Sequence, residues 1–124
     1  MSAVVDASVV LAWLQDEPGA DAAEPMLMEG IIGAANWSEV LQKARQHGAP
    51  SGVVARLLTS FGLRVVDVTS ADAEVAADLW RPASPLSLGD RLCLALGLRT
   101  SLPVATADEA WRGLDGGPTV LVIR

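Results

Sequence analysis

Short runs of apolar, mostly β-branched residues recur along the chain, and segments of helical length separate them. The clearest runs cover residues 3–5, 64–68, 103–105 and 119–123, and a weaker, glycine-rich run covers residues 30–34. Strands that are buried on both faces of a parallel sheet have this composition, because helices cover both sides of such a sheet. The pattern therefore predicts an α/β fold with a central, mainly parallel sheet of four to five short strands.

Helical spacing and turn residues predict where the helices lie between these runs. Ser70 is the expected N-cap of one helix, and Pro82 ends that helix before a loop over residues 82–86. The expected helices cover residues 7–15, 20–29, 36–46, 51–61, 70–81 and 87–98, and a helical turn or two covers residues 108–114. Ligands of parallel sheets bind beyond the carboxyl ends of the strands, so the functional residues are expected there.

The length of 124 residues predicts a single domain over residues 1–124, with a core that needs no disulfide or metal to fold. Hydrophobic residues make up 51% of the chain and charged residues 19%, which excludes intrinsic disorder. No apolar run approaches the roughly 18 residues of a membrane span, and the N-terminus lacks the features of a signal peptide. We therefore expect a cytoplasmic protein with no membrane partner.

The net charge and the small number of cysteine and histidine residues exclude several classes of function. Nine basic against fifteen acidic residues give a net charge of −6, which argues against coating nucleic acid by bulk electrostatics. An enzyme that acts on nucleic acid through a carboxylate-bound metal remains possible, because the metal supplies the positive charge. One cysteine, Cys93, and one histidine, His47, exclude a disulfide framework and zinc sites that need several of either residue.

Four acidic residues stand at predicted strand ends or in the first turns of helices: Asp6, Glu39, Asp90 and Asp108. Each has an ordinary structural interpretation. Asp6 and Asp108 suit helix N-caps, and the first turns of two helices contain pairs with the spacing of a capping box. These pairs are Ser87 with Asp90 and Asn36 with Glu39. Taken one at a time, acids in such places are more often caps than ligands.

Taken together, the four acids favour a metal site. Strand carboxyl ends and the helix starts that follow them lie on one edge of a parallel sheet, so the four side chains can converge there. Crowded carboxylates repel one another unless a cation lies between them. Ligation by oxygen alone points to Mg²⁺ or Mn²⁺ rather than zinc, and such a site suits phosphodiester hydrolysis.

Four segments give the chain a family resemblance that extends over nearly its whole length. They are VVDASVVLAWL at residues 4–14, NWSE at 36–39, LSLGDRLCLALG at 86–97 and LPVATADEAW at 102–111. With these segments the sequence resembles the PIN-domain nucleases, and most closely the VapC-type toxins of toxin–antitoxin pairs. The resemblance implies a PIN-like three-layer α/β/α sandwich and a metal-dependent endoribonuclease.

The resemblance also assigns roles to individual residues. It places the acidic quartet that binds Mg²⁺ or Mn²⁺ and cleaves RNA on four residues: Asp6, Glu39, Asp90 and Asp108. Ser8 and Thr106 would be hydroxyls that orient the carboxylates or a water. Arg91 would contact a substrate phosphate, with a solvated surface arginine as the alternative.

Partners follow from the same resemblance and from the charge. The family implies a homodimer and a cognate antitoxin, and a basic segment of that antitoxin would neutralise the acidic pocket. Apolar residues of the first two helices would form a groove for an amphipathic helix of the partner. These residues are Val10, Trp13, Leu14, Met26 and Leu27.

Competing functions differ in what they require. A phospho-accepting receiver domain needs paired acids after the first strand and a lysine near the last one, but Asp6 stands alone and Lys43 lies mid-chain in a predicted helix. A phosphatase with a DxD pair is excluded because the chain reads Asp6-Ala7-Ser8. A non-catalytic α/β binding module, in which the acids are only helix caps, remains the alternative to the nuclease.

Overall fold

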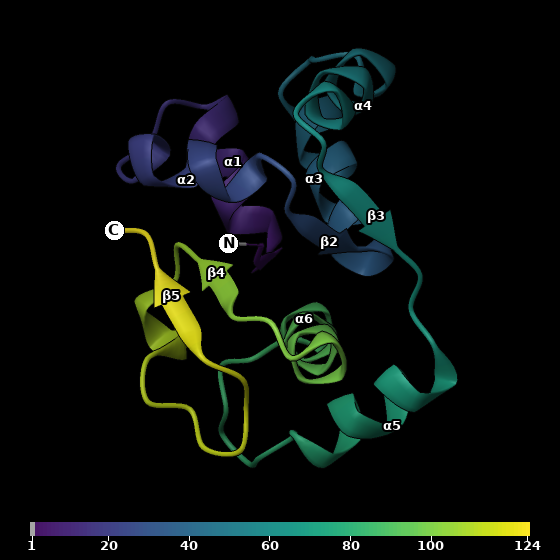
Figure 1. Cartoon of the computed structure of the whole chain (residues 1–124), viewed down its shortest axis with the longest axis vertical. Coiled ribbons are helices and arrows are strands. Elements are labelled where there is room, and N and C mark those ends of the chain that lie inside the picture. The colour runs from purple at the N-terminus through teal and green to yellow at the C-terminus, as the bar shows by residue number, and fades with distance from the viewer. Residues whose placement is uncertain (1) are drawn as a thin grey trace.

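Five parallel strands form the central sheet of the computed structural model, which describes residues 2–124 (Figure 1). The strands are β1 (Val4–Val5), β2 (Ile31–Gly33), β3 (Arg64–Val66), β4 (Val104–Thr106) and β5 (Val120–Val122). Their order in the sheet is β3-β2-β1-β4-β5, and all neighbouring strands are parallel. The predicted parallel α/β sheet is confirmed, and the weak run at 30–34 supplies the strand beside the central one.

Helices connect these strands, mostly where the sequence predicts them. In residues 2–124 they are α1 (Ala7–Leu14), α2 (Ala20–Leu27), α3 (Ala34–Gln46), α4 (Ser51–Ser60), α5 (Ser70–Asp78), α6 (Leu88–Thr100) and the 3-10 helix η1 (Glu109–Trp111).

Several helix boundaries differ from the prediction: α5 already ends at Asp78, before Pro82 can end it, and α6 continues to Thr100. Three further differences have local reasons. α3 begins at Ala34, directly after β2, because the extended Gly33 is its N-cap. Thr69 rather than Ser70 caps α5, since the Thr69 hydroxyl oxygen accepts a hydrogen bond from the Asp72 N–H at 3.1 Å. α2 ends at Leu27 because the next residue already has extended backbone dihedrals.

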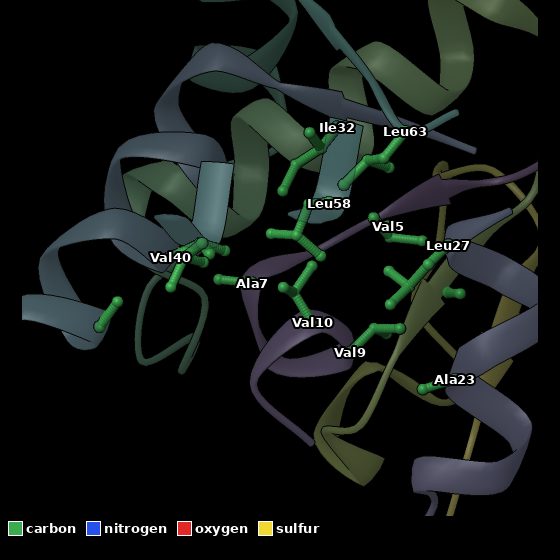
Figure 2. Packing of buried hydrophobic residues seen from close by; sticks show 13 residues of the cluster. Val5, Ala7, Val9, Val10, Ala23, Leu27, Ile32, Val40, Leu58 and Leu63 are labelled. Carbon is green, nitrogen blue, oxygen red and sulfur yellow. The ribbon is translucent and has the colours of Figure 1, made fainter. Parts of the chain in front are cut away.

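Different helices cover the two faces of the sheet, and alternate strand residues point to each face. Val5 and Ile32 pack on one side against α1, α2, α3 and α4 (Figure 2). Val4 and Ile31 pack on the other side against α6 and against Trp111 of η1. The expected three-layer α/β/α sandwich is thereby confirmed.

The close approach of α6 to the sheet depends on one glycine. A Cβ atom at Gly97 would lie 2.5 Å from Cγ2 of Val104 and 2.9 Å from Cγ of Pro118. Any larger residue would therefore push α6 away from β4.

An ion pair between the buried Asp72 and the exposed Arg99 connects the far end of α6 to the start of α5. Arg99 donates from Nε to Oδ1 of Asp72 at 2.8 Å and from Nη2 to Oδ2 at 3.0 Å. Asp72 is 4% exposed and also completes the capping box with Thr69. Burial alone would raise the pKa of Asp72, but the bonds from Arg99 and Thr69 outweigh it and lower that pKa.

The apolar residues expected to form a groove on the first two helices have different environments. Val10 and Leu27 are fully buried in the core and offer nothing to a partner. Trp13, Leu14 and Met26 are half-buried against that core. The expected groove is therefore wrong for two of its five residues, whose side chains fill the interface between the helices and the sheet.

Within residues 2–124, every helix is too short or too polar to cross a membrane.

Candidate active site

Asp6 directly follows β1 and is buried, with 5% of its surface exposed. Its Oδ1 accepts hydrogen bonds from the Ser8 hydroxyl at 2.5 Å and from the Val9 N–H at 3.2 Å, and the latter bond caps α1. Its Oδ2 accepts a hydrogen bond from the Thr106 hydroxyl at 2.7 Å. Burial raises the pKa of Asp6 to about 6, although these hydrogen bonds favour the charged form. A nearby cation would stabilise this buried charge further.

Ser8 and Thr106 join the carboxyl ends of β1 and β4, and their hydroxyl oxygens are 3.3 Å apart. The Ser8 oxygen accepts a hydrogen bond from the Ala107 N–H at 2.9 Å, and the Thr106 oxygen accepts one from the Asp108 N–H at 3.1 Å. Asp108 itself is exposed, and its Oδ1 caps η1 by accepting from the Ala110 N–H at 2.9 Å. The two hydroxyls thus fix the backbone from which the Asp108 side chain extends.

Asp90 lies in the first turn of α6 and is half-buried. Its Oδ2 accepts a hydrogen bond from the Ser87 N–H at 2.9 Å, and its own N–H donates to the Ser87 hydroxyl at 3.1 Å. The predicted capping box is confirmed here. It fixes the carboxylate at the N-terminus of α6, where the helix dipole favours a negative charge.

Glu39 is half-buried on the second turn of α3. Nδ2 of Asn36 donates to Oε1 of Glu39 at 3.4 Å and to the carbonyl oxygen of Gly89 at 3.3 Å. The expected Asn36–Glu39 capping box is wrong, because α3 begins two residues earlier and Asn36 lies inside its first turn. The two residues instead form a contact between α3 and the first turn of α6.

Electrostatic effects place three of the four acids near one another. Burial raises the pKa of Glu39, and the charge of Asp90 raises it further. Asp90 also raises the pKa of Asp6, after burial. The buried thiol of Cys93 has a pKa well above its usual value because of burial and because all three carboxylates act on it. The contacts of Glu39 and Asn36 with Gly89 place Glu39 at the first turn of α6, which holds Asp90. The Thr106 hydroxyl connects Asp6 to the backbone of Asp108.

These carboxylates are close but do not form a ready-made metal centre. In the described part of the chain, no three acidic, histidine or cysteine side chains are grouped tightly enough to hold a metal ion. Capping uses Oδ2 of Asp90 and Oδ1 of Asp108, and within residues 2–124 the other oxygen of each carboxylate accepts no hydrogen bond. The capping and ligand roles are therefore compatible for the same residue.

Arg91 follows Asp90 but is directed toward another helix. Its Nη1 donates to the carbonyl oxygen of Ala76 on α5 at 2.8 Å, and its Nε is buried with no hydrogen-bond partner among residues 2–124. The alternative of a solvated surface arginine is wrong, because the guanidinium fastens α6 to α5. A phosphate contact by Arg91 stays a prediction.

Two residues of this site, Asn36 and Gly89, lie in segments that carry the family resemblance, but the sequence assigns neither of them a functional role. Asn36 resembled a capping residue, and Gly89 was one of eleven glycines. Their proximity to Glu39 arises only when α3 and α6 meet across the edge of the sheet.

Comparison with known proteins identifies the family. Residues 3–117 match the family model described as the PIN domain. The chain belongs to the PIN-domain family. No curated protein sequence matches this PIN domain significantly.

Solved structures with the same fold include several toxin–antitoxin proteins. A toxin–antitoxin complex from Klebsiella pneumoniae has a TM-score of 0.79 at 20% identity, over 98% of both chains. VapBC2 from Rickettsia felis, bound to a DNA fragment from its promoter, has a TM-score of 0.75 at 9% identity over the whole of both chains. VapC20 from Mycobacterium tuberculosis, described as a sarcin–ricin loop cleaving toxin, has a TM-score of 0.70 at 14% identity over 88% of this PIN domain and 91% of that chain.

Proposed function

We propose that this PIN domain is a metal-dependent endoribonuclease, the toxin of a VapC-type toxin–antitoxin pair. The residues proposed to carry the reaction are Asp6, Glu39, Asp90 and Asp108. One observation supports the proposal: Glu39 lies against Gly89, next to Asp90 in the first turn of α6, and the charge of Asp90 raises the pKa of Glu39 and of Asp6. Such a group of acids is stable as charged species only when a cation accompanies it.

The donor set fits Mg²⁺ or Mn²⁺, because it consists of carboxylate oxygens with no histidine or thiolate. Asp90 and Asp108 each have one oxygen left over after capping, and Glu39 is half-exposed. Since the acids form no ready-made cluster among residues 2–124, we expect the Asp90 and Asp108 side chains to turn toward the ion while Glu39 keeps its contact with Asn36. When bound, such an ion would activate water and screen the charge of the phosphodiester.

The chain's own groups prepare the site for this chemistry. The Ser8 and Thr106 hydroxyls donate to both oxygens of Asp6 and hold that carboxylate charged and in one orientation. The same hydroxyl oxygens accept hydrogen bonds from the backbone N–H groups of Ala107 and Asp108. The acids therefore extend from the ends of strands and helices rather than from mobile loops, which limits their reorganisation during the reaction.

Cleavage of RNA with and without metal tests the proposal. The purified chain is incubated with structured RNA in Mg²⁺, in Mn²⁺ or in a chelator, and the products are mapped. We expect cleavage in single-stranded or loop RNA that requires the metal. Asp90→Asn should keep the fold and lose cleavage by orders of magnitude. The matched control is Asp78→Asn, which removes an exposed charge at the end of α5 and should cleave like the parent.

The alternative function is a non-catalytic binding module, and one observation favours it. Asp6 and Asp108 are helix N-caps and Asp90 completes the capping box of α6, as that alternative requires. It predicts that the chain binds no divalent metal and that asparagine, which caps about as well as aspartate, replaces each acid without effect.

Cleavage that persists in a chelator after rigorous purification would also contradict the metal mechanism.

The proposed partners are RNA as substrate, a second copy of the chain as a homodimer, and an antitoxin with a basic segment. The structures from Klebsiella pneumoniae and Rickettsia felis are described as toxin–antitoxin proteins, which supports the antitoxin. The net charge of −6 and the acidic edge favour an arginine- or lysine-rich inhibitor. RNA as a substrate also favours the predicted cytoplasmic location.

Co-expression with the neighbouring gene of its operon tests the antitoxin proposal. We expect a small protein with a basic segment to co-purify with the chain and to inhibit cleavage. A neighbour that is acidic, or that does not bind, would contradict this part of the proposal.

A further inference from the structure

Asn36 is placed to control the Glu39 carboxylate. It is 2% exposed and lies one turn before Glu39 on the same helix. Its Nδ2 group donates one hydrogen bond to Oε1 of Glu39 on α3, at 3.4 Å. The same Nδ2 group donates another to the carbonyl oxygen of Gly89 on α6, at 3.3 Å. The amide is thus anchored on the first turn of α6 while it donates to the carboxylate.

The other half of the Asn36 amide shows that packing alone does not explain this residue. Its Oδ1 is buried, and in the part of the chain that the structure describes it accepts no hydrogen bond. An unpaired buried acceptor destabilises a fold, so an apolar side chain of similar size would be the better filler. The donor side of the amide is the part that makes specific contacts.

Gly89 provides the space that the carboxylate occupies. A Cβ atom at this position would lie 2.5 Å from Oε1 of Glu39 and 3.6 Å from its Cδ. Because the carboxylate ends a flexible side chain, an alanine here would displace Glu39 rather than distort α6. Gly89 also immediately precedes Asp90, so the contact sets one acid relative to another.

We propose that Asn36 is a positioning residue that holds the Glu39 carboxylate beside Asp90, and that glycine at position 89 keeps the space for it. The inference rests on the proposed function, because it takes Glu39 as a ligand of the divalent cation. Without this contact the three side-chain torsions of Glu39 are free, and metal binding has to order them. Outer contacts of this kind typically contribute 10- to 100-fold to metal affinity.

Titration with Mn²⁺ alone, followed by the signal of free Mn²⁺ in electron paramagnetic resonance, measures the effect without any RNA. Asn36→Ala and Gly89→Ala should each weaken Mn²⁺ binding about 10- to 100-fold. The matched control is Gly52→Ala. Gly52 is the second residue of α4, as Gly89 is of α6. Apart from its own helix backbone and chain neighbours, its added Cβ would meet a single atom of residues 2–124, Nη1 of Arg56 at 3.7 Å. This control should bind Mn²⁺ like the parent.

Two further measurements separate positioning from a general effect on the fold. Gly89→Ala should melt at or above the parent temperature in chelator, because alanine favours a helix more than glycine does. Its stability and its metal affinity should therefore change in opposite directions. Asn36→Ala should weaken Mn²⁺ binding no further when Glu39→Gln is already present, but should keep its full effect beside Asp108→Asn.

Failure of this inference is distinguishable from failure of the proposed function. A parent chain that binds no Mn²⁺ overturns both. A parent that binds Mn²⁺, with Asn36→Ala binding equally well, overturns only the inference. The inference is also overturned if Asn36→Ala weakens Mn²⁺ binding equally in the Glu39→Gln and the Asp108→Asn proteins. If Asn36→Ala does not fold, Gly89→Ala with and without Glu39→Gln provides the same comparison.

Discussion

Asp6 combines deep burial with a need for charge, and this conflict makes it sensitive to pH. Its pKa rises from 3.8 to about 6, mainly through burial, so the folded state binds the proton more tightly than the unfolded chain does. A group with a raised pKa contributes stability that is fully present below pH 3.8 and is lost as pH rises through about 6. A shift of about two pKa units means that the charged Asp6 carboxylate lowers the free energy of unfolding by about 3 kcal/mol relative to its protonated form.

Replacing Asp6 by asparagine should remove this penalty. At pH 7.5 in chelator, we expect Asp6→Asn to melt several degrees above the parent, because asparagine still caps α1 and carries no charge. At pH 5 the folded parent binds the proton but the unfolded chain mostly does not, so the difference should shrink to about half; it approaches zero only below pH 3.8. Calorimetry of both proteins from pH 5 to pH 8 checks this. An Asp6→Asn protein that melts below the parent at pH 7.5 would contradict the account of Asp6.

Thr106 is fully buried and makes two bonds that valine cannot make. Thr106→Val keeps the shape but removes the donor to Asp6 and the acceptor for the Asp108 N–H. We expect a loss of about 1–3 kcal/mol of stability and a 10- to 100-fold loss of Mn²⁺ affinity. Chemical denaturation and Mn²⁺ titration measure the two effects. Thr100→Val is the control and should leave the affinity unchanged, since among residues 2–124 the Thr100 hydroxyl donates only to carbonyl oxygens of its own helix.

At the scale of elements, the pairing of α5 with α6 depends on the Asp72–Arg99 ion pair. Asp72→Ala should destabilise the fold by about 1–3 kcal/mol, because it removes the charge-assisted bonds from Arg99 and the capping-box contact with Thr69. Arg99 is 37% exposed, so water solvates its charge when the partner is lost. The pKa of Asp72 is lowered, so its contribution is present above pH 3.8 and is lost as pH falls through the lower, folded pKa. Urea denaturation from pH 3 to pH 7 should show the difference between parent and variant narrowing only at the acid end.

The Glu17–Arg124 contact provides the matched control for this ion pair. These side chains are 4.0 Å apart and more than a third exposed, so Glu17→Gln should change stability by less than about 1 kcal/mol. An equal effect of the two substitutions would show that the Asp72–Arg99 pair has no special role.

Local signals explain how much of this fold and site the sequence predicts. The β-branched runs, the Ser87–Asp90 capping box and the acids at strand ends depend on neighbours in sequence, and the structure has them where we expected. The predicted Asn36–Glu39 capping box is wrong because two residues three positions apart have the same spacing in a capping box as on one face of a helix. The role of Gly89 and the direction of Arg91 depend on contacts with other helices, which no local pattern encodes.

At the scale of the whole molecule, the site lies where helices from opposite faces of the sheet meet. Asp6 and Asp108 follow β1 and β4, Glu39 comes from α3 on one face, and Asp90 comes from α6 on the other. A cation at this edge would therefore connect the two helical layers as well as neutralise the acids. Metal binding is expected to stabilise the entire fold, not only the first turn of one helix.

Melting with and without Mn²⁺ tests this coupling in the absence of RNA. A ligand that binds only the folded state stabilises it by about 2.7 kcal/mol at one hundred times its dissociation constant, which is several degrees for a domain of this size. We expect this gain for the parent in millimolar Mn²⁺ and its near loss in Asp6→Asn, Asp90→Asn and Asp108→Asn. Asp78→Asn should keep the gain. Identical melting of all these proteins with and without Mn²⁺ would leave the acids as helix caps and contradict the metal site.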